Sequence, residues 1–212
     1  MLRKEVSEAG PDRRPRDPEQ TRRDLLSAAA SEIHLHGYQA ASLSQIIIDA
    51  GVTKGALYHH FANKQALGYA VLDEIWAPRL RRMWMDCLES SEADPVEALI
   101  TKIHEAGDSM KDRDLALGCP INNLAQEMSP IDEGFRVRIN DLLAQWRAAI
   151  ASALRRGQAD GSVAAVVDTE AAASMLVATL EGCLGMAKNA QSRELFVQCG
   201  SGAIHYLNTL RG

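Results

Sequence analysis

Apolar residues recur at steps of three and four positions through most of this 212-residue chain, which is the period of an amphipathic helix. The first such stretch begins at Thr21 and carries Leu26, Ala29 and Ile33 on one face. Gly37 should end it, because glycine readily adopts the left-handed conformation that closes a helix. The pattern therefore predicts one helix between the threonine and this glycine.

Two much shorter helices are predicted next, separated by a glycine. Ser42 and Gln45 form a capping-box pair that opens the first of them, and Gly51 ends it. Thr53 can cap the second, which runs to about Phe61. A helix, a glycine turn and a second helix over about residues 42–61 have the proportions of a helix-turn-helix, whose second helix enters the DNA major groove.

The remainder of the chain is also predicted to be helical. Asn63 can cap a helix over about residues 64–88, and Asp94 followed by Pro95 opens another that reaches about Met110. After a break and a short helix near residues 122–124, Ser129-Pro130 opens a helix that should end at Gly157. The last two helices are capped by Asp168 and Ser192. No convincing strand is found, so the predicted fold class is all-α with about nine helices.

The short helix that follows Thr53 should have two different faces. Advancing by 100° per residue from Lys54 places Leu57 and Phe61 on the side that packs against the preceding helices. Gly55 and Tyr58 fall on the opposite side, where glycine allows close approach and polar groups can reach phosphates or base edges. The alternative is an ordinary surface helix, which leaves its small apolar surface unexplained.

Two adjacent histidines of this helix are predicted to have different roles. His59 faces outward with the polar side, whereas His60 lies next to the buried edge and is expected to be a packing residue. A shared metal site is disfavoured, because neighbouring side chains on a helix point about 100° apart. No metal site and no cofactor are predicted.

The stretch AGVTKGALYHHFANKQAL closely resembles part of the N-terminal domain of the TetR (tetracycline-repressor) family of transcriptional regulators. The resemblance implies a three-helix helix-turn-helix domain over residues 21–67 that binds DNA. It also implies a helical effector-binding and dimerisation domain over residues 68–212. Residues 1–20 mix charge, proline and glycine without periodicity, and they are predicted to form a disordered arm.

The resemblance further implies roles for individual residues. Ser42 and Ser44 are expected to contact a DNA phosphate, helped by the positive end of the helix dipole. Further phosphate contacts are expected from Thr53, Tyr58 and Lys64. Contacts to base edges are expected from Lys54, Gly55 and His59. The histidine can instead touch the backbone. For each residue alone, the alternative is a solvated polar side chain.

The charge of the chain limits how it can bind DNA. The formal net charge is −5, and residues 1–75 carry nine Lys or Arg against ten Asp or Glu, a net of −1. No general basic patch supports binding, so the affinity must come from placed contacts and from two copies of the site. Arg13, Arg14 and Arg16 could reach an adjacent minor groove, although a basic arm is more often simply disordered.

Two helices near the C-terminus are predicted to form a homodimer. The one over about residues 169–188 is apolar nearly all round, so one of its faces needs a partner. A four-helix interface between two subunits, as in the family resembled, is expected to involve Leu176, Leu180, Leu184, Phe196, Cys199, Ile204 and Leu207. The alternative is a single fully buried helix in a monomer.

The centre of the second domain is expected to hold an effector cavity, if the resemblance extends that far. Apolar walls with a few amides suit a small organic ligand, whose identity the sequence leaves open. The residues expected to line it, each of which could instead be core, are Trp84, Met110, Asn122, Asn123, Trp146 and Met186. Cys119 invites a thiol-sensor interpretation, although a buried inert cysteine is the default.

Composition disfavours other classes of protein. Four cysteines lie far apart and no apolar secretory segment opens the chain, so reduced thiols in the cytoplasm are expected rather than a disulfide framework. No apolar run approaches the roughly 18 residues typical of a membrane span. A helical-bundle enzyme is the alternative function, but no Glu lies three residues before any of the six histidines. The expected partners are double-stranded DNA, a second copy and a small-molecule effector.

Overall fold

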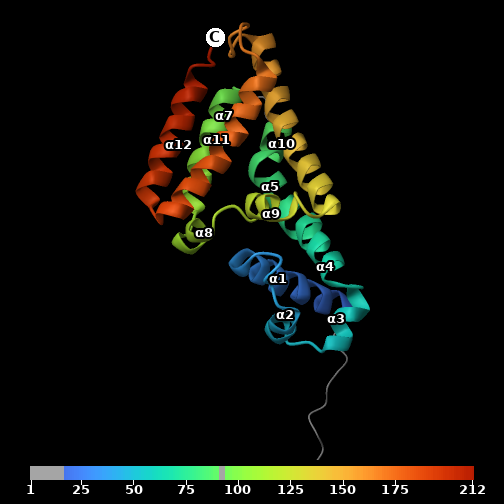
Figure 1. Ribbon diagram of the computed structural model, residues 1–212. Coiled ribbons are helices and arrows are strands. Elements are labelled where there is room, and N and C mark those ends of the chain that lie inside the picture. The colour runs from blue at the N-terminus through green and yellow to red at the C-terminus, as the bar shows by residue number, and fades with distance from the viewer. Residues whose placement is uncertain (1–16, 91–93) are drawn as a thin grey trace, which may run out of the picture.

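The computed structural model describes residues 17–90 and 94–212, which form an all-α protein in two parts (Figure 1). A small head contains α1 (Pro18–His36), α2 (Leu43–Ala50) and α3 (Lys54–His60). The connection to a larger body is made by α4 (Lys64–Val71), the π-helical segment η1 (Leu72–Trp76) and α5 (Ala77–Trp84). The body continues with α6 (Asp86–Ser90), α7 (Pro95–Ser109), α8 (Asp112–Leu117), α9 (Pro120–Met128), α10 (Glu133–Asp160), α11 (Thr169–Ala190) and α12 (Arg193–Asn208).

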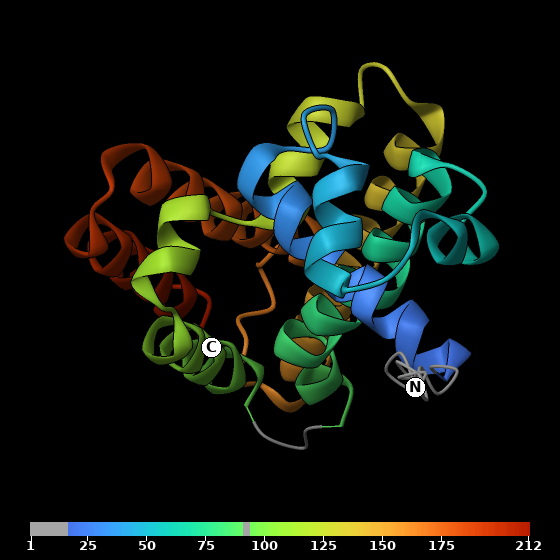
Figure 2. The same ribbon diagram turned by 90° about the horizontal axis from the view of Figure 1, so that it is seen from below.

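The predicted fold class is confirmed, although the described residues form twelve α-helices rather than about nine. Their only β-type pairing is an isolated bridge between Val163 and Arg211. In both ribbon views, α12 lies at one edge of the molecule and α3 at the other (Figures 1 and 2).

The first helix begins earlier than predicted. The Asp17 carboxylate accepts a hydrogen bond from the Glu19 backbone N–H at 3.1 Å, and Pro18 occupies the first turn. The same cap and proline precede α7, where the predicted start is confirmed. Residues 17–20 therefore belong to the head. The rest of the predicted disordered arm, including Arg13, Arg14 and Arg16, lies outside the described residues.

The single helix predicted over about residues 64–88 is interrupted. Pro78 has no backbone N–H, and its ring excludes the carbonyl four residues earlier. The Ala77 N–H instead bonds to the Leu72 carbonyl, five residues back, which is the π-helical pattern. The chain therefore widens by one residue just before the proline, and α5 begins with this proline in its first turn.

The long helix α10 also differs from its prediction at both ends. It begins after Asp132, whose carboxylate accepts a hydrogen bond from the Phe135 N–H at 3.0 Å, and not after the preceding Ser-Pro pair. It continues past Gly157 and ends at Gly161, which has a φ of 87°. A Cβ at Gly157 would lie 2.6 Å from Val163 Cγ2, so this glycine serves close packing rather than helix termination.

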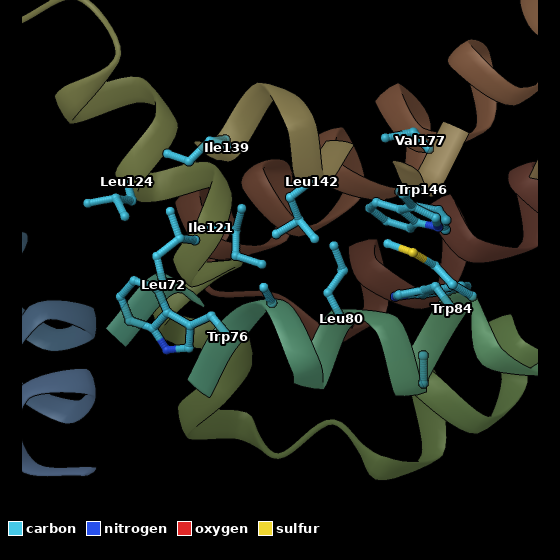
Figure 3. Packing of buried hydrophobic residues seen from close by; sticks show 14 of the residues in the cluster. Leu72, Trp76, Leu80, Trp84, Ile121, Leu124, Ile139, Leu142, Trp146 and Val177 are labelled. Atoms are coloured by element: carbon cyan, nitrogen blue, oxygen red, sulfur yellow. The ribbon is translucent and has the colours of Figure 1, made fainter. Parts of the chain in front are cut away.

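The core of the body lies between α5, α9, α10 and α11. Figure 3 shows Leu80 of α5 pointing toward Leu142 of α10. Trp84 and Trp146 pack beside each other at one end of this core, with ring centroids 5.4 Å apart. These buried side chains hold the helices that surround the cavity described below.

Carboxylates of the body hold the head in place at a junction around α9. Glu127 accepts hydrogen bonds from the backbone N–H groups of Tyr38 and Gln39, both at 2.8 Å. Asp132 accepts a hydrogen bond from the Tyr69 hydroxyl at 2.7 Å. These bonds join α9 and the turn after it to the loop following α1 and to the connecting helix α4.

A disulfide joins the last two helices. Cys183 of α11 and Cys199 of α12 are bonded, with their Cα atoms 5.6 Å apart. The expectation of four reduced thiols is therefore wrong for this pair, whereas Cys87 and Cys119 are free. The two bonded cysteines are 16 residues apart in sequence, but the turn between the helices folds α12 back along α11 and brings them together.

Among the described residues, α11 is also the one helix long and apolar enough to cross a membrane by length and composition. The expectation that no apolar run approaches this length is therefore corrected. The helix packs against α10 and α12, and Ala173 and Leu176 are buried in the body. Core helices of globular proteins meet the same criterion.

Candidate nucleic-acid interface and ligand cavity

Side-chain caps fix where α2 and α3 begin. Ser42 Oγ accepts a hydrogen bond from the Gln45 N–H at 3.3 Å, and Thr53 Oγ1 accepts one from the Ala56 N–H at 3.1 Å. Gly51 ends α2 in the left-handed conformation, with a φ of 61°. Capping uses only an oxygen lone pair, so each hydroxyl keeps a proton that it can donate to a phosphate.

The third helix presents one face to the head core and the other to solvent. Leu57 and Phe61 are buried, with 0% and 3% of their surface exposed. The exposed positions, called the α3 face below, are Lys54, Gly55, Tyr58 and His59. The predicted division of this helix into two faces is confirmed, while contact with DNA remains a prediction. Ser42, Ser44 and Thr53 are exposed too.

The α3 face has room for a close partner. A Cβ added at Gly55 would meet only Thr53 Oγ1, at 3.8 Å. Lys54 Nζ lies 5.9 Å from the centroid of the Tyr58 ring, which is within cation–π range. A positive charge and a phenol hydroxyl therefore stand together beside an open stretch of backbone.

The two histidines differ in burial as predicted. His59 is exposed, whereas His60 is half-buried and lies between its neighbour and Phe61, with ring centroids 5.2 Å and 6.3 Å away. Their rings meet edge to face and do not converge on a common point. Within the described residues, no group of three or more His, Cys, Asp or Glu side chains could hold a metal ion.

Lys64, the predicted phosphate clamp, is half-buried against the loop that leads into α2. Its ammonium donates hydrogen bonds to the carbonyls of Gln39 and Ala41, at 2.9 Å and 2.7 Å, and lies 5.1 Å from the Tyr38 ring centroid. Burial lowers the pKa of this ammonium. Lys64 therefore holds the loop that leads into α2, while its contact with a DNA phosphate stays a prediction.

A second residue that positions this loop is absent from the predicted site. Glu32 is only 7% exposed, and its carboxylate accepts a hydrogen bond from the Ser42 backbone N–H at 2.9 Å. Glu32 therefore fixes the position of Ser42, the residue that caps α2 and that is expected to contact DNA. Its signal in the sequence is an acid placed beside the apolar stripe of α1.

A cavity of about 160 Å³ lies inside the body. Three of the predicted lining residues border it, namely Trp84, Met110 and Trp146. The other three lie elsewhere: Asn122 accepts a hydrogen bond from Gln126, Asn123 bonds to Lys188 and to the Leu117 carbonyl, and Met186 is 54% exposed on the outside of α11. The amides therefore serve helix contacts, and the cavity is more apolar than predicted.

The polar groups that do reach the cavity include Glu181, Cys119 and His34. Glu181 Oε2 and Trp146 Nε1 are buried and have no hydrogen-bond partner among the described residues. Burial raises the pKa of the Cys119 thiol, which hydrogen-bonds the Glu181 carboxyl, and burial also raises the pKa of that carboxyl. A protonated thiol is unreactive, which disfavours the thiol-sensor interpretation. The only sequence signal for Glu181 is a single acid in the middle of an apolar helix.

The predicted dimer residues pack within their own subunit. Each of them lies in the core of the subunit, on the wall of the cavity or in the disulfide. They are Leu176, Leu180, Leu184, Phe196, Cys199, Ile204 and Leu207. The prediction chose the inner faces, because both helices are apolar on more than one side and periodicity does not show which side is covered. Exposed positions along the outer face of α11 and α12 are Ser174, Met175, Ala178, Gly182, Gly185, Met186, Val197, Ser201, Gly202 and His205.

Comparisons with known proteins agree on one family. Residues 25–71 match the model for bacterial regulatory proteins of the tetR family, and residues 95–198 match the tetracyclin repressor-like C-terminal domain. The chain is 30% identical over 137 residues to the HTH-type transcriptional regulator LmrA of Bacillus subtilis, covering 64% of this chain and 72% of that protein.

A second relative and a solved structure extend the likeness to most of the chain. The HTH-type transcriptional repressor DhaR of a Mycobacterium species is 27% identical over 173 residues, covering 82% of this chain and 85% of that protein. The crystal structure of regulatory protein TetR from Rhodobacter sphaeroides is 25% identical with a TM-score of 0.77, covering 88% of this chain and 98% of that one. These proteins are regulators, which removes the helical-bundle enzyme as an alternative. The chain belongs to the TetR family of DNA-binding transcriptional regulators.

Proposed function

We propose that the protein is a cytoplasmic transcriptional repressor that binds a palindromic operator as a homodimer and leaves it when a small molecule binds. The α3 face carries this proposal. It offers Lys54 and Tyr58 to solvent beside the open backbone of Gly55, while the buried side of the helix is anchored in the head. That DhaR is named a repressor supports repression over activation.

The second copy is proposed to lie against the outer face of α11 and α12. A Cβ at Gly182, Gly185 or Gly202 would meet nothing within 4 Å, so a partner helix could approach closely there. Met175 and Val197 are 55% and 58% exposed, which adds apolar surface that a partner would cover. Two helices from each copy would then form a four-helix contact.

The contact between α1 and the segment before α9 is proposed to carry ligand control. His34 Nε2 lies 2.8 Å from the Gly118 carbonyl oxygen, and both residues border the cavity. Burial lowers the pKa of His34, which favours the neutral ring with its proton on Nε2. A ligand in the cavity would act on this contact and so on the spacing of the two heads. It can shift DNA affinity only if it binds the two spacings with different affinity.

A selection of DNA fragments from the protein's own genome tests the proposal. The full chain should retain one or a few fragments and protect two half-sites related by a two-fold axis, spaced to match two α3 helices. The Tyr58→Ala variant is the matched control and should retain far less of the same fragments. Retention without sequence preference, or equal retention by the variant, would contradict the proposal.

A further inference from the structure

The cavity has the size of a small aromatic molecule. Its volume is about 160 Å³, close to the roughly 150 Å³ of an engineered apolar cavity that binds benzene. The walls include the indoles of Trp76, Trp84 and Trp146 and the thioethers of Met83 and Met110. A single ring or a short branched chain therefore fits, whereas a large polycyclic compound does not.

Glu181 is an acid without a cation beside it. It belongs to α11, and its Oε2 is buried with no hydrogen-bond partner among the described residues. Burial raises the pKa of its carboxyl, and none of the ion pairs among the described residues includes it. The other ionisable side chains lining the cavity are His34, which bonds a carbonyl, Arg79, which is exposed, and Asp114.

We infer that this cavity binds a small organic cation, an ammonium group on an aromatic or short aliphatic body, with the ammonium at Glu181 Oε2 and the body among the indoles. The inference rests on the proposed ligand-responsive function and names the class of its ligand. A carboxylate and an ammonium form a charge-assisted hydrogen bond, and indole faces attract cations within about 6 Å. Both attractions are strongest where water is excluded.

Other charge types fit the same groups less well. Without a cation, burial favours the protonated carboxyl, so a neutral hydroxyl would gain only an ordinary hydrogen bond there. An ammonium would stabilise the ionised form and gain a charge-assisted hydrogen bond, whereas an anion would find no counter-charge at this carboxyl. Glu181 Oε2 has no hydrogen-bond partner among the described residues, so it is open to an ammonium donor. Trp146 Nε1 also has no partner and would favour a cation whose body carries an ether or hydroxyl oxygen.

Calorimetric titration of the full chain without DNA tests the inference with three probes of equal size. Benzylamine is a cation at pH 7, benzyl alcohol is neutral and benzoate is an anion. Benzylamine should bind about tenfold more tightly than benzyl alcohol, or more, and benzoate should give no binding heat. No binding of benzylamine, or binding of the alcohol or benzoate with equal affinity, would overturn the inference.

Two substitutions assign the effect to the acid inside the cavity. Glu181→Gln keeps the shape of the side chain and removes its charge. It should therefore lower the affinity for benzylamine about tenfold and leave the affinity for benzyl alcohol unchanged. Asp114→Asn is the matched control and should change benzylamine affinity less than threefold. Unchanged benzylamine binding in Glu181→Gln overturns the assignment.

Folding and DNA binding are read separately from ligand binding. Circular dichroism establishes that each variant is folded, and if Glu181→Gln is not, the three-probe comparison on the unmodified chain decides by itself. Because no DNA is present, a protein that binds its operator but not benzylamine would contradict only the ligand class. One that binds benzylamine but no operator would contradict only the proposed repressor function.

Discussion

The α3 face and the outer face of α11 and α12 are both exposed and both contain glycines that open onto empty space, yet their surroundings are chemically opposite. Gly55 stands between Lys54 and Tyr58. Gly182 and Gly185 stand among methionine, alanine and serine side chains on a helix that is apolar nearly all round. The first surface suits a polyanion, and the second suits another helix.

The comparison shows that a glycine specifies only how closely a partner can approach. The neighbouring side chains decide which partner that is. A lysine and a hydroxyl near an open backbone favour phosphate oxygens, whose hydrogen bonds are charge-assisted. Apolar side chains near an open backbone favour helix packing, because they gain free energy only when covered. Substitutions of equal size and charge on the two surfaces should therefore give different losses.

The largest effect is expected from Gly182→Glu. The subunit should fold normally, since a Cβ there meets nothing within 4 Å and glutamate favours a helix more than glycine does. A buried like-charge pair should, however, prevent dimer formation and lower operator affinity by about a hundredfold or more, because two linked heads bind far more tightly than one. Light scattering and a DNA titration on the same sample measure both losses.

Gly107→Glu is the matched control for this substitution. Its added Cβ also meets nothing within 4 Å, but the residue lies on α7, away from the outer face of α11 and α12. This variant should remain a dimer with unchanged affinity for the operator. A dimeric Gly182→Glu protein would show that the second copy docks elsewhere.

Gly55→Glu, unlike Gly182→Glu, should impair DNA binding without impairing dimer formation. The variant should stay dimeric and keep its helicity, because the space in front of this residue is open in the subunit. It should lose operator binding by about tenfold to a hundredfold, since a carboxylate would face the phosphates at the closest approach. Gly55→Ala separates bulk from charge and should lose less. Wild-type affinity in the glutamate variant would contradict the assignment of this face.

Single truncations on the α3 face should have smaller effects. Tyr58→Ala and Lys54→Ala should each weaken operator binding by about 1–3 kcal/mol while helicity and dimerisation remain. Loss of the tyrosine should weaken all sequences alike, whereas loss of the lysine should also change sequence preference. Titrations against the operator and against single-base variants of it distinguish the two. If both proteins held the operator at wild-type affinity, neither residue would be a contact.

The smallest effects are expected at the two histidines. His59→Ala should weaken DNA binding by less than about 1 kcal/mol and leave the melting temperature unchanged. His60→Ala should lower the free energy of unfolding by about 1 kcal/mol, because the half-buried ring packs beside Phe61. Thermal melts and DNA titrations of both variants measure this. The reverse pattern would mean that the outward and inward roles are exchanged.

The same two regions differ in how far sequence predicts them. The faces of α3 follow from a cap at Thr53 and a step of 100°, because a seven-residue helix with two large apolar residues has one way to bury them. Apolar residues lie on all sides of α11, so the sequence does not show which face of the helix packs against its own subunit. In the structure, Leu176 and Leu184 face inward. Periodicity identifies orientation only where polar residues mark the other side.

Contacts between distant segments are the second class of feature that the sequence does not show. Lys64 reaches the carbonyls of Gln39 and Ala41, and Glu181 reaches Cys119, across 23 to 62 positions of the chain. The local pattern of apolar and polar residues does not predict contacts between residues so far apart in the chain. By contrast, the π-helical segment before Pro78 was within reach of sequence reasoning, since a proline in a long helical run predicts a break.

The junction between head and body has a consequence for exchanging DNA specificity among regulators. Glu127 binds backbone N–H groups at residues 38 and 39, which any sequence without proline there supplies. The other bond requires the hydroxyl of Tyr69, which lies on α4 beyond the α3 face. A chimaera that replaces residues 17–63 and keeps α4 would therefore retain both of these attachments. It must also keep a histidine at residue 34 and an arginine at residue 22, because these side chains bond to Gly118 and to Glu74 of the body.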